Sequence, residues 1–361
     1  MKIGILTSGG DCPGLNATMR AFVKAICSKT SDVKILGFLN GYTGLIGGDF
    51  REMTKKDFSA ILNRGGTILG SIRQPFRLMT VVEGNEKSRL QKMLENYKKL
   101  GLDLLVTLGG SGTHKTAALL ASEGCNVIGL PKTIDNDLWG TDKTFGFSTA
   151  LEIATGCIDR LHTTAASHGR AMLVEVMGNK TGWLALEAGI ASGAHAILMP
   201  EVPFNPASVV SLVSRRRQRG KTHTMIVLAE GAITKEEASL RRRERQERRA
   251  ALGITSLAEW LAQKLETEVG IEARTQVIGY LQRGGSPNAY DKMLCSMMGS
   301  FAGELAAAGK VGVTVALSGT QLVANPLSEI AGKLKVVPAD SPMIPLAKNL
   351  GIRFCDEDPA T

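Results

Sequence analysis

The sequence lacks the features of several protein classes. No apolar run in its 361 residues approaches the roughly 20 residues of a membrane-spanning helix, and no cleavable apolar leader opens the chain. Aromatic residues make up only 5%, against 41 glycines that do not repeat with the collagen period. A hydrophobic content of 43% supplies a core and excludes disorder. We therefore expect a soluble, cytoplasmic protein of one large or two medium domains that does not associate with membranes.

The cysteines and histidines show neither disulfide nor metal-ligand spacing. The six cysteines are scattered without a C-x-x-C pair, and the five histidines form no cluster with them. This argues against a disulfide framework and against a zinc site.

The basic residues are concentrated in one segment. The net charge is +9, and the stretch from Arg241 to Arg249 holds six Arg and two Glu. Residues 235–251 therefore predict a charged, solvated helical insertion. An arginine-rich helix can also neutralise nucleic-acid phosphates, so binding of nucleic acid through residues 240–251 is a hypothesis from another class. No aromatic residue interleaves the run, so we expect no nucleic-acid partner.

Short apolar, β-branched runs alternate with longer helical patterns along nearly the whole chain. This alternation is typical of strand-helix-strand units with mostly parallel sheets. The expected strands are residues 2–6, 104–108, 127–130, 171–176, 196–199, 225–229, 276–279 and 311–316. The first helix is predicted by apolar residues that share one helical face, namely Leu15, Met19, Phe22, Val23 and Ile26.

Two glycine-rich segments stand where a strand ends and a helix begins. They are residues 8–17 (SGGDCPGLNA) and 108–115 (LGGSGTHK). Paired glycines let a ligand approach the backbone, and the helix amino terminus offers free N–H groups to an anion. A glycine-rich turn alone is often structural, and the second segment has neither the Walker ending nor the dinucleotide fingerprint. Two such cradles on one sheet favour a polyphosphate ligand.

Residues 131–137 (PKTIDND) follow another strand and place Asp135 and Asp137 two residues apart. The pattern suits phosphoryl transfer, because one carboxylate can accept a hydroxyl proton while the other holds Mg²⁺. An Asx-rich turn that caps a helix explains the same residues equally well.

Three arginines near two further strands can bind phosphate. Arg274 and Arg283 flank an expected strand and a Gly-Gly turn, and two such side chains can clamp a phosphate by charge-assisted hydrogen bonds. Surface salt bridging is the alternative for either residue alone. Arg170 precedes the strand at residues 171–176, whose following loop (residues 177–182) can lie over a sugar.

Taken in this order, the segments resemble the phosphofructokinase family. Bacterial members carry GGDxPGxNA, a GGDG-like nucleotide loop, TIDND, VEVMG and Q-RGGSP, and the resemblance runs from about residue 2 to about residue 287. It implies the phosphofructokinase fold, an α/β fold of two Rossmann-like three-layer domains with mostly parallel sheets. The phosphoryl-donor domain would comprise residues 1–146 and about 284–330, and the sugar-phosphate domain residues 147–283 and about 331–361.

The resemblance also implies the reaction, in which ATP with Mg²⁺ phosphorylates the 1-hydroxyl of fructose 6-phosphate to give fructose 1,6-bisphosphate in glycolysis. Asp135 matches the catalytic base, with Thr133 beside the reacting hydroxyl and Arg73 at the transferred phosphoryl group. Asp137 and Ser111 match the metal-binding positions. The implied donor-binding residues are Gly10, Arg73, Gly110, Ser111, Gly112, Thr113 and Lys132. The implied sugar-phosphate residues are Thr133, Asp135, Arg170, Met177, Gly178, Asn179, Glu230, Arg274, Tyr280 and Arg283. A homo-oligomer, dimer or tetramer, is implied, in which Arg170 completes a neighbour's site.

This chain departs from the family pattern at several positions. Ser111 stands where most members have Asp, Asn179 where many have Arg, and Tyr280 where many have His. His162 stands where the bacterial effector site usually has Arg, which weakens the case for a phosphorylated effector.

Two positions that indicate the phosphoryl donor, 112 and 132, point to different donors. Pyrophosphate-dependent relatives have Asp at the position of Gly112 and Lys at the position of Lys132, and this chain shares only the lysine. A glycine leaves room for the α-phosphate of a nucleotide, so ATP is expected and a pyrophosphate-dependent fructose 6-phosphate 1-phosphotransferase is the alternative. Lipid and NAD kinases share the Gly-Gly-x-Gly turn but lack TIDND and QRGGSP. Other sugar phosphates, such as sedoheptulose 7-phosphate, remain open as acceptors.

Overall fold

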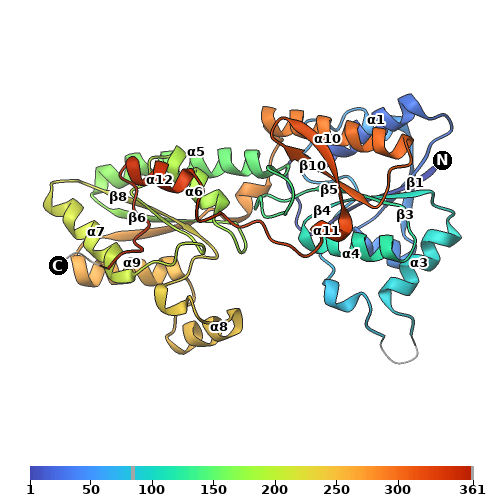
Figure 1. Cartoon of the computed structure of the whole chain (residues 1–361). Helices are drawn as coiled ribbons and strands as arrows, with labels where there is room; N and C mark the ends of the chain where they lie inside the picture. Colours follow the sequence, from blue (N-terminus) through green and yellow to red (C-terminus); the bar gives the residue numbers. More distant parts are fainter. Residues whose placement is uncertain (83–85, 359–361) are drawn as a thin grey trace. The chain divides into compact units, whose positions relative to one another are not determined.

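The computed structural model describes residues 1–82 and 86–358, which form two compact units (Figure 1). Unit 1 comprises Met1–Thr149 and Arg283–Lys335, and unit 2 comprises Ala150–Gln282 and Val336–Thr361. Each unit is therefore assembled from two separate stretches of the sequence. A search of the described helices finds none that is both long enough and apolar enough to span a bilayer.

Unit 1 is built on a seven-stranded sheet in the order β11-β10-β5-β4-β1-β2-β3. Its strands are β1 (Lys2–Ser8), β2 (Lys34–Phe38), β3 (Phe50–Met53), β4 (Leu104–Gly109), β5 (Val127–Pro131), β10 (Val313–Ser318) and β11 (Gln321–Pro326). The five central strands are parallel, and the edge strands β3 and β11 pair antiparallel with their neighbours. Helices cover both faces of the central strands, which explains their nearly continuous apolar sequence.

The helices of unit 1 lie on the two faces of this sheet (Figure 1). One face carries α1 (Leu15–Lys29) and α10 (Ala289–Ala307), and the other carries α2 (Tyr42–Gly47), α3 (Arg89–Lys99), α4 (Ser111–Ser122) and α11 (Leu327–Ile330). Short 3₁₀ helices, η1 (Lys55–Phe58) and η2 (Phe76–Leu78), lie in the connections. Gly299 and Gly303 let α10 approach the backbone of α1 so closely that a Cβ at either position would collide with it.

Unit 2 is built on a four-stranded parallel sheet in the order β7-β8-β6-β9. Its strands are β6 (Ala171–Val176), β7 (Ala196–Leu198), β8 (Thr224–Ala229) and β9 (Ala273–Val277). In Figure 1, α5 (Phe147–His168), α6 (Trp183–Ala191) and α12 (Met343–Asn349) lie on one side of the sheet, and α7 (Pro206–Gln218) and α9 (Leu257–Val269) on the other. The core under α7 and α9 joins Leu173 and Ile226 of the sheet to Val209 and Leu261 of the helices.

The predicted α/β class with mostly parallel sheets is confirmed, and the apolar face predicted for α1 is buried. The strand expected at residues 276–279 was shifted: β9 runs from Ala273 to Val277, so only its last two residues coincide with the expectation, and residues Gly279–Arg283 form a 3₁₀ helix, η4. Gly279 has a φ of 54°, which breaks the extended backbone there. The expected charged insertion contains a short 3₁₀ helix, η3 (Lys235–Glu237), followed by the helix α8 (Arg242–Ala251).

Candidate active site

Three predicted donor loops meet at the carboxyl edge of the sheet of unit 1. They follow β1, β4 and β5, which are parallel neighbours, so their ends lie at the same edge. The backbone N–H of Lys132 donates to the carbonyl of Gly109 at 3.1 Å, and its ammonium donates to the carbonyl of Gly10. One residue therefore ties the three loops together.

Lys132 is a buried cation, with 4% of its surface exposed. Loss of solvent on burial lowers the pKa of its ammonium. The nearby Arg283 adds to this lowering, whereas Asp135 opposes it. A lysine in this position holds the glycine-rich loop after β1 in place and directs positive charge towards the neighbouring carboxylates.

The loop at residues 131–137 is fixed by its own hydrogen bonds. Asn136 adopts a left-handed backbone with φ of 51°, and its side-chain oxygen accepts from the Thr144 N–H at 3.1 Å and from the Lys335 ammonium at 2.9 Å. The Thr133 hydroxyl accepts from the Asp135 N–H at 3.0 Å. No helix begins between residues 132 and 146, so the loop does not serve as a helix cap there.

This framework sets the two carboxylates of the motif. Asp137 is buried, with 5% of its surface exposed, whereas Asp135 is only half-buried. The rigid backbone and the difference in exposure suit a loop that presents one carboxylate to a ligand and keeps the other within the protein.

Arg73 lies on a segment that runs beside the end of β1. The Ser71 hydroxyl donates to the carbonyl of Gly9 at 2.7 Å, and the Gly9 N–H donates to the carbonyl of Ile72 at 3.4 Å. Arg73 itself is exposed. The structure therefore brings this predicted residue to the same sheet edge as Lys132.

Arg283 was grouped by sequence with the sugar-phosphate residues, and within unit 1 it lies against Gly10 of the predicted donor loop. A Cβ on Gly10 would collide with the Arg283 guanidinium. A side chain at position 10 would therefore displace the Arg283 guanidinium, a contact that the sequence pattern alone does not reveal.

The predicted nucleotide loop leads into α4, whose amino terminus follows Gly110. Around Gly112 the described part of the chain leaves open space, since no atom lies within 4 Å of a Cβ built there. Ser111 and Gly112 occupy the first turn, where helical N–H groups lack intrahelical partners and can bind an anion. Thr113 was predicted to bind the donor. In the structure its hydroxyl donates to the Ser8 carbonyl at 3.4 Å and stabilises the loop.

Sequence reasoning missed His114, the next residue of this loop. It is 1% exposed, and its two ring nitrogens lie 3.1 Å from the Gly110 carbonyl and 2.8 Å from the Thr314 hydroxyl. Burial lowers its pKa to about 4, so it is neutral at pH 7. Its contact with Thr314 spans 200 residues, and no local pattern could have indicated it.

In unit 2 a second group of predicted residues lies at the carboxyl edge of the sheet. The Asn179 N–H donates to the Glu230 carboxylate at 2.5 Å, and the Glu230 N–H donates to the carbonyl of Val176 at 2.9 Å. Gly178 and Asn179 both have positive φ, of 148° and 55°. The loop after β6 is thereby folded tightly against the end of β8.

Tyr280 belongs to this same edge, because η4 follows β9. Its side chain is 80% exposed. Gln282, which sequence reasoning did not name, is fully buried and accepts from the Met177 N–H at 3.0 Å. It connects η4 to the loop that carries the predicted residues Met177 and Gly178.

Arg170 and Arg274 lie at the opposite, amino-terminal edge of that sheet. Arg170 immediately precedes β6, and Arg274 pairs in register with Met172 near the start of the same strand. Both guanidinium groups form ion pairs with Glu272, Arg170 at 2.7 Å, and hydrogen bonds from Arg170 hold the pKa of that carboxylate below its usual value. Six strand residues span about 20 Å, so a single chain does not bring these arginines to Asn179 and Glu230 within unit 2.

The donor set was tested for a metal ion. Among the described residues no group of three or more His, Cys, Asp or Glu side chains is arranged to hold one. Asp135, Asp137 and Ser111 offer only oxygen atoms. A hard cation that keeps several waters and takes most ligands from substrate phosphates, as Mg²⁺ does, fits this set, whereas a fully protein-bound metal does not.

Comparison with known proteins gives concordant results. A family model described as "Phosphofructokinase" matches residues 2–306. The ATP-dependent 6-phosphofructokinase of Spirochaeta thermophila is 50% identical over 98% of this chain and 97% of its own length. A pyrophosphate–fructose 6-phosphate 1-phosphotransferase of Amycolatopsis methanolica is 43% identical over 94% of this chain and 97% of its own length. A solved phosphofructokinase of Pichia pastoris superposes with a TM-score of 0.77 at 30% identity, covering 97% of this chain but only 36% of the yeast chain.

Proposed function

The chain belongs to the phosphofructokinase family, and we propose that it transfers the terminal phosphoryl group of ATP to the 1-hydroxyl of fructose 6-phosphate, giving fructose 1,6-bisphosphate and ADP in the cytoplasm. It is an enzyme that transfers phosphoryl groups and has the fold of this family. The observation that carries the proposal is the meeting of three loops at one sheet edge, tied by Lys132, with Asp135 presented beside them.

In this proposal Asp135 accepts the proton of the sugar 1-hydroxyl as the new O–P bond forms and the bond to the leaving ADP oxygen breaks. The half-buried position of its carboxylate supports this role, because a base must reach the substrate. Thr133 orients the loop through the Asp135 N–H, and Arg73 supplies positive charge at the same edge.

The N–H groups at the start of α4 and the open space at Gly112 would receive the donor phosphates, together with Gly10, Gly110 and Lys132. Asp137 and Ser111 would hold Mg²⁺, which neutralises charge on the phosphates when it is bound. The sugar phosphate would meet Met177, Gly178, Asn179, Glu230, Tyr280 and Arg283.

The positions of Arg170 and Arg274 support a site shared between subunits. They lie at the far edge of their own sheet, where they share Glu272. We infer a homo-oligomer in which both arginines leave this ion pair to hold the 6-phosphate bound to a neighbouring subunit. The sequence expectation assigned this role to Arg170 alone.

Pyrophosphate is the second candidate donor, favoured by Lys132 and by the name of the Amycolatopsis relative. Gly112 and the Spirochaeta relative favour ATP. A coupled assay of the unmodified protein on fructose 6-phosphate, first with ATP and then with pyrophosphate, tests the proposal. We expect a higher kcat/KM with ATP, a preference for pyrophosphate would replace the donor, and no turnover with either would refute the function.

A further inference from the structure

The charged insertion of unit 2 borders a half-open cavity that extends beyond the predicted sugar site. The cavity is about 450 Å³ in volume, within the range of about 300–1,000 Å³ typical of small-molecule sites. Its charged and amide-bearing walls include Asn179, Lys180 and Glu230 on one side and Arg242, Arg245 and Arg249 from α8 on the other. It shares Asn179 and Glu230 with the predicted sugar site but does not include Met177, Gly178 or Tyr280.

The position of α8 is fixed by Arg249. This guanidinium makes two bonds to the Glu237 carboxylate, at 2.6 and 2.7 Å, and donates to the carbonyl of Ala232 at 3.0 Å. The Glu237 side chain is only 6% exposed. A paired, bidentate contact of this kind holds the helix in one place although its other side chains are exposed. In Figure 1, α8 lies apart from the sheet of unit 2. The contacts of Arg249 therefore hold α8 where it forms one wall of the cavity.

The charges of α8 divide into two groups. Arg243 pairs with Glu247 and Arg248 pairs with Glu236, so these two arginines are neutralised away from the cavity. Arg242 and Lys180 make no hydrogen bond or ion pair within the described part of the chain, and both line the cavity. Arg245 donates only to the carbonyl of Leu240. Uncompensated positive charge is therefore concentrated on the cavity.

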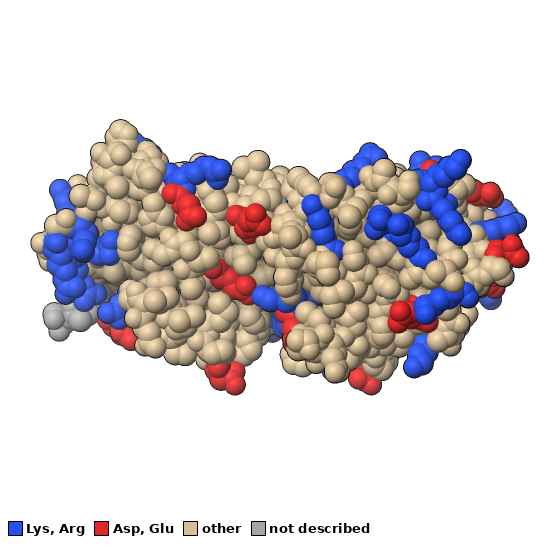
Figure 2. All heavy atoms as spheres, turned by 90° about the horizontal axis from the view of Figure 1, so that it is seen from above, with Lys and Arg blue, Asp and Glu red and all other residues tan. Residues whose placement is uncertain are grey.

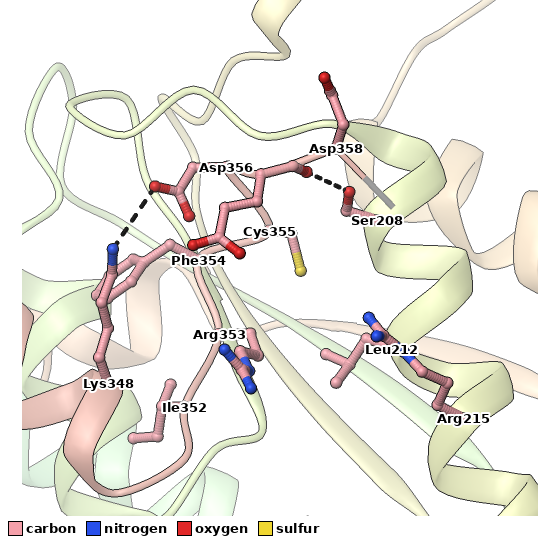
Figure 3. Close-up of a pocket in the computed structure, with 11 residues that line it drawn as sticks. Ser208, Leu212, Arg215, Lys348, Ile352, Arg353, Phe354, Cys355, Asp356 and Asp358 are labelled. Carbon is pink, nitrogen blue, oxygen red and sulfur yellow. Dashed lines mark hydrogen bonds and ion pairs between the residues drawn. The ribbon is translucent and has the colours of Figure 1, made fainter. Parts of the chain in front are cut away.

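A smaller cavity in unit 2 has balanced charges, in contrast to the cavity beside α8. It has a volume of about 160 Å³ and lies between α7 and the C-terminal segment (Figure 3). There Lys348 pairs with Asp356, and the Ser208 hydroxyl donates to the Glu357 carbonyl. Arg215 and Arg353 there face a similar number of carboxylates, so the charges balance. The cavity under α8 has one carboxylate, Glu230, against several cations.

We propose that the cavity between α8 and the loop after β6 is a second anion site that binds a small phosphate ester, and that its occupancy alters sugar-phosphate binding. A hollow of about 450 Å³ with cations on both sides matches a small anion in size and charge. Figure 2 shows the face on the side away from α8, where Lys and Arg side chains form separate groups. Coupling follows from Asn179 and Glu230, which line the cavity and are joined by a hydrogen bond. This coupling, but not the anion site itself, rests on the proposed function.

The test compares neighbouring arginines of one helix. Inorganic phosphate is titrated calorimetrically into the full-length protein, with fructose 6-phosphate and a non-hydrolysable ATP analogue present at saturation. We expect a remaining phosphate site that Arg242→Gln or Arg245→Gln weakens roughly tenfold. Arg243→Gln is the matched control, since it removes the same charge from a side chain that is 89% exposed, and it should leave phosphate binding unchanged.

A second readout tests the coupling. Phosphate should change the half-saturating concentration of fructose 6-phosphate in the unmodified protein and in Arg243→Gln, and this effect should be absent in Arg242→Gln. The site would be refuted if the sugar phosphate displaces all bound phosphate, or if Arg242→Gln and Arg243→Gln weaken phosphate binding equally. Tighter binding of a short DNA duplex than of phosphate, lost equally in both variants, would identify a nucleic-acid surface and overturn the proposal. Phosphate binding can be measured on protein without kinase activity, so failure of the proposed function is distinguished from failure of this site.

Discussion

The two units arrange their predicted ligand-binding residues differently. In unit 1 the residues after β1, β4 and β5 gather at one sheet edge, where Lys132 bonds to Gly10 and Gly109. In unit 2 the predicted residues lie at both edges: Asn179 and Glu230 at the carboxyl edge, Arg170 and Arg274 at the amino edge. Unit 1 thus contains a complete loop cluster, whereas unit 2 presents two half-sites that face different directions.

The difference follows from sheet topology. Ligands of open parallel sheets bind outside the carboxyl ends, and every predicted residue of unit 1 in this cluster follows or flanks such an end. Arg170 and Arg274 do not follow this rule: both pair with Glu272 at the amino edge, where Arg274 is exposed and Arg170 is half-buried. Under the proposed function, catalysis belongs to the loops of unit 1 and part of the substrate recognition to contacts between chains.

The largest expected effect lies in the gathered loops of unit 1. Asp135→Asn should lower kcat by roughly 10² to 10⁴, because the amide keeps the shape of the carboxylate but cannot accept the proton. Binding of fructose 6-phosphate should be nearly unchanged, which calorimetry can measure beside the rate. Asp142→Asn, in the same unit but outside the loop, is the control. Full activity in Asp135→Asn would remove the catalytic assignment from unit 1.

The next largest effect is expected for Arg170 and Arg274, at the amino edge of the sheet of unit 2. Arg170→Ala and Arg274→Ala should each raise the KM for fructose 6-phosphate by about one to two decades with a smaller change in kcat, because a charge-assisted bond to a non-reacting phosphate is worth roughly 1.5–3 kcal/mol. Arg243→Ala, a paired arginine elsewhere in the unit, should leave the KM unchanged.

Subunit mixing makes this prediction specific to a shared site. Hybrids of Asp135→Asn and Arg274→Ala chains combine an intact base on one chain with an intact arginine on the other. If the site is shared, these hybrids should be more active than the mixture of the two separate parents. If the hybrids have only the summed activity of the parents, Arg274 acts in the site of its own chain, and the site is not shared between chains.

The sequence predicted the strands of the parallel core well but missed β2, β3 and β11. The core strands are buried on both faces and are therefore apolar without interruption. β3 and β11 are antiparallel edge strands with exposed or half-exposed residues, so their sequences resemble loops. β2 is buried except for Lys34, but it is only five residues long and was missed for its shortness. Periodicity cannot identify a short strand whose pairing partner lies elsewhere in the chain.

The site shows the same division between local and distant information. The Asp135 loop and the glycine turns were found because their residues are adjacent in sequence. The contacts of Arg283 with Gly10 and of His114 with Thr314 join residues 273 and 200 positions apart, and the separation of Arg274 from Asn179 depends on strand direction. Such relations arise only when the sheet is assembled.

A smaller effect concerns donor choice at the sheet edge of unit 1. Gly112→Asp should depress kcat/KM for ATP several-fold more than any activity with pyrophosphate, because a carboxylate would enter the open space and repel a nucleotide phosphate. The two activities are compared in one coupled assay, with Gly47→Asp, at an exposed position of α2 that also leaves open space, as control. Equal losses with both donors would show that the substitution disturbs α4 and carries no information on the donor.

The smallest effect on activity, but one that compares the two units directly, is the loss of stability in acid. His114 of unit 1 and His195 of unit 2 have folded-state pKa values lowered by burial to about 4 and about 3, below the unfolded value of about 6.5. As the pH falls from about 6.5 towards 4, the unfolded chain takes up protons that the folded chain does not. The free energy of unfolding therefore decreases with falling pH, by up to about 1.4 kcal/mol per pH unit for the buried His114.

His195 should contribute less, because it is only partly buried and solvent screens its charge. Thermal unfolding between pH 7.5 and 5 measures the slope of Tm against pH in the unmodified protein, in His114→Asn and in His195→Asn. His114→Asn should lower the overall Tm, since the bonds to Gly110 and Thr314 are lost, yet flatten the slope most. His168→Asn, at an exposed position of α5, should retain the slope. If His195→Asn flattens the slope more than His114→Asn, most of the stability lost in acid comes from His195 in unit 2. The loops of unit 1 then do not depend on a buried neutral histidine.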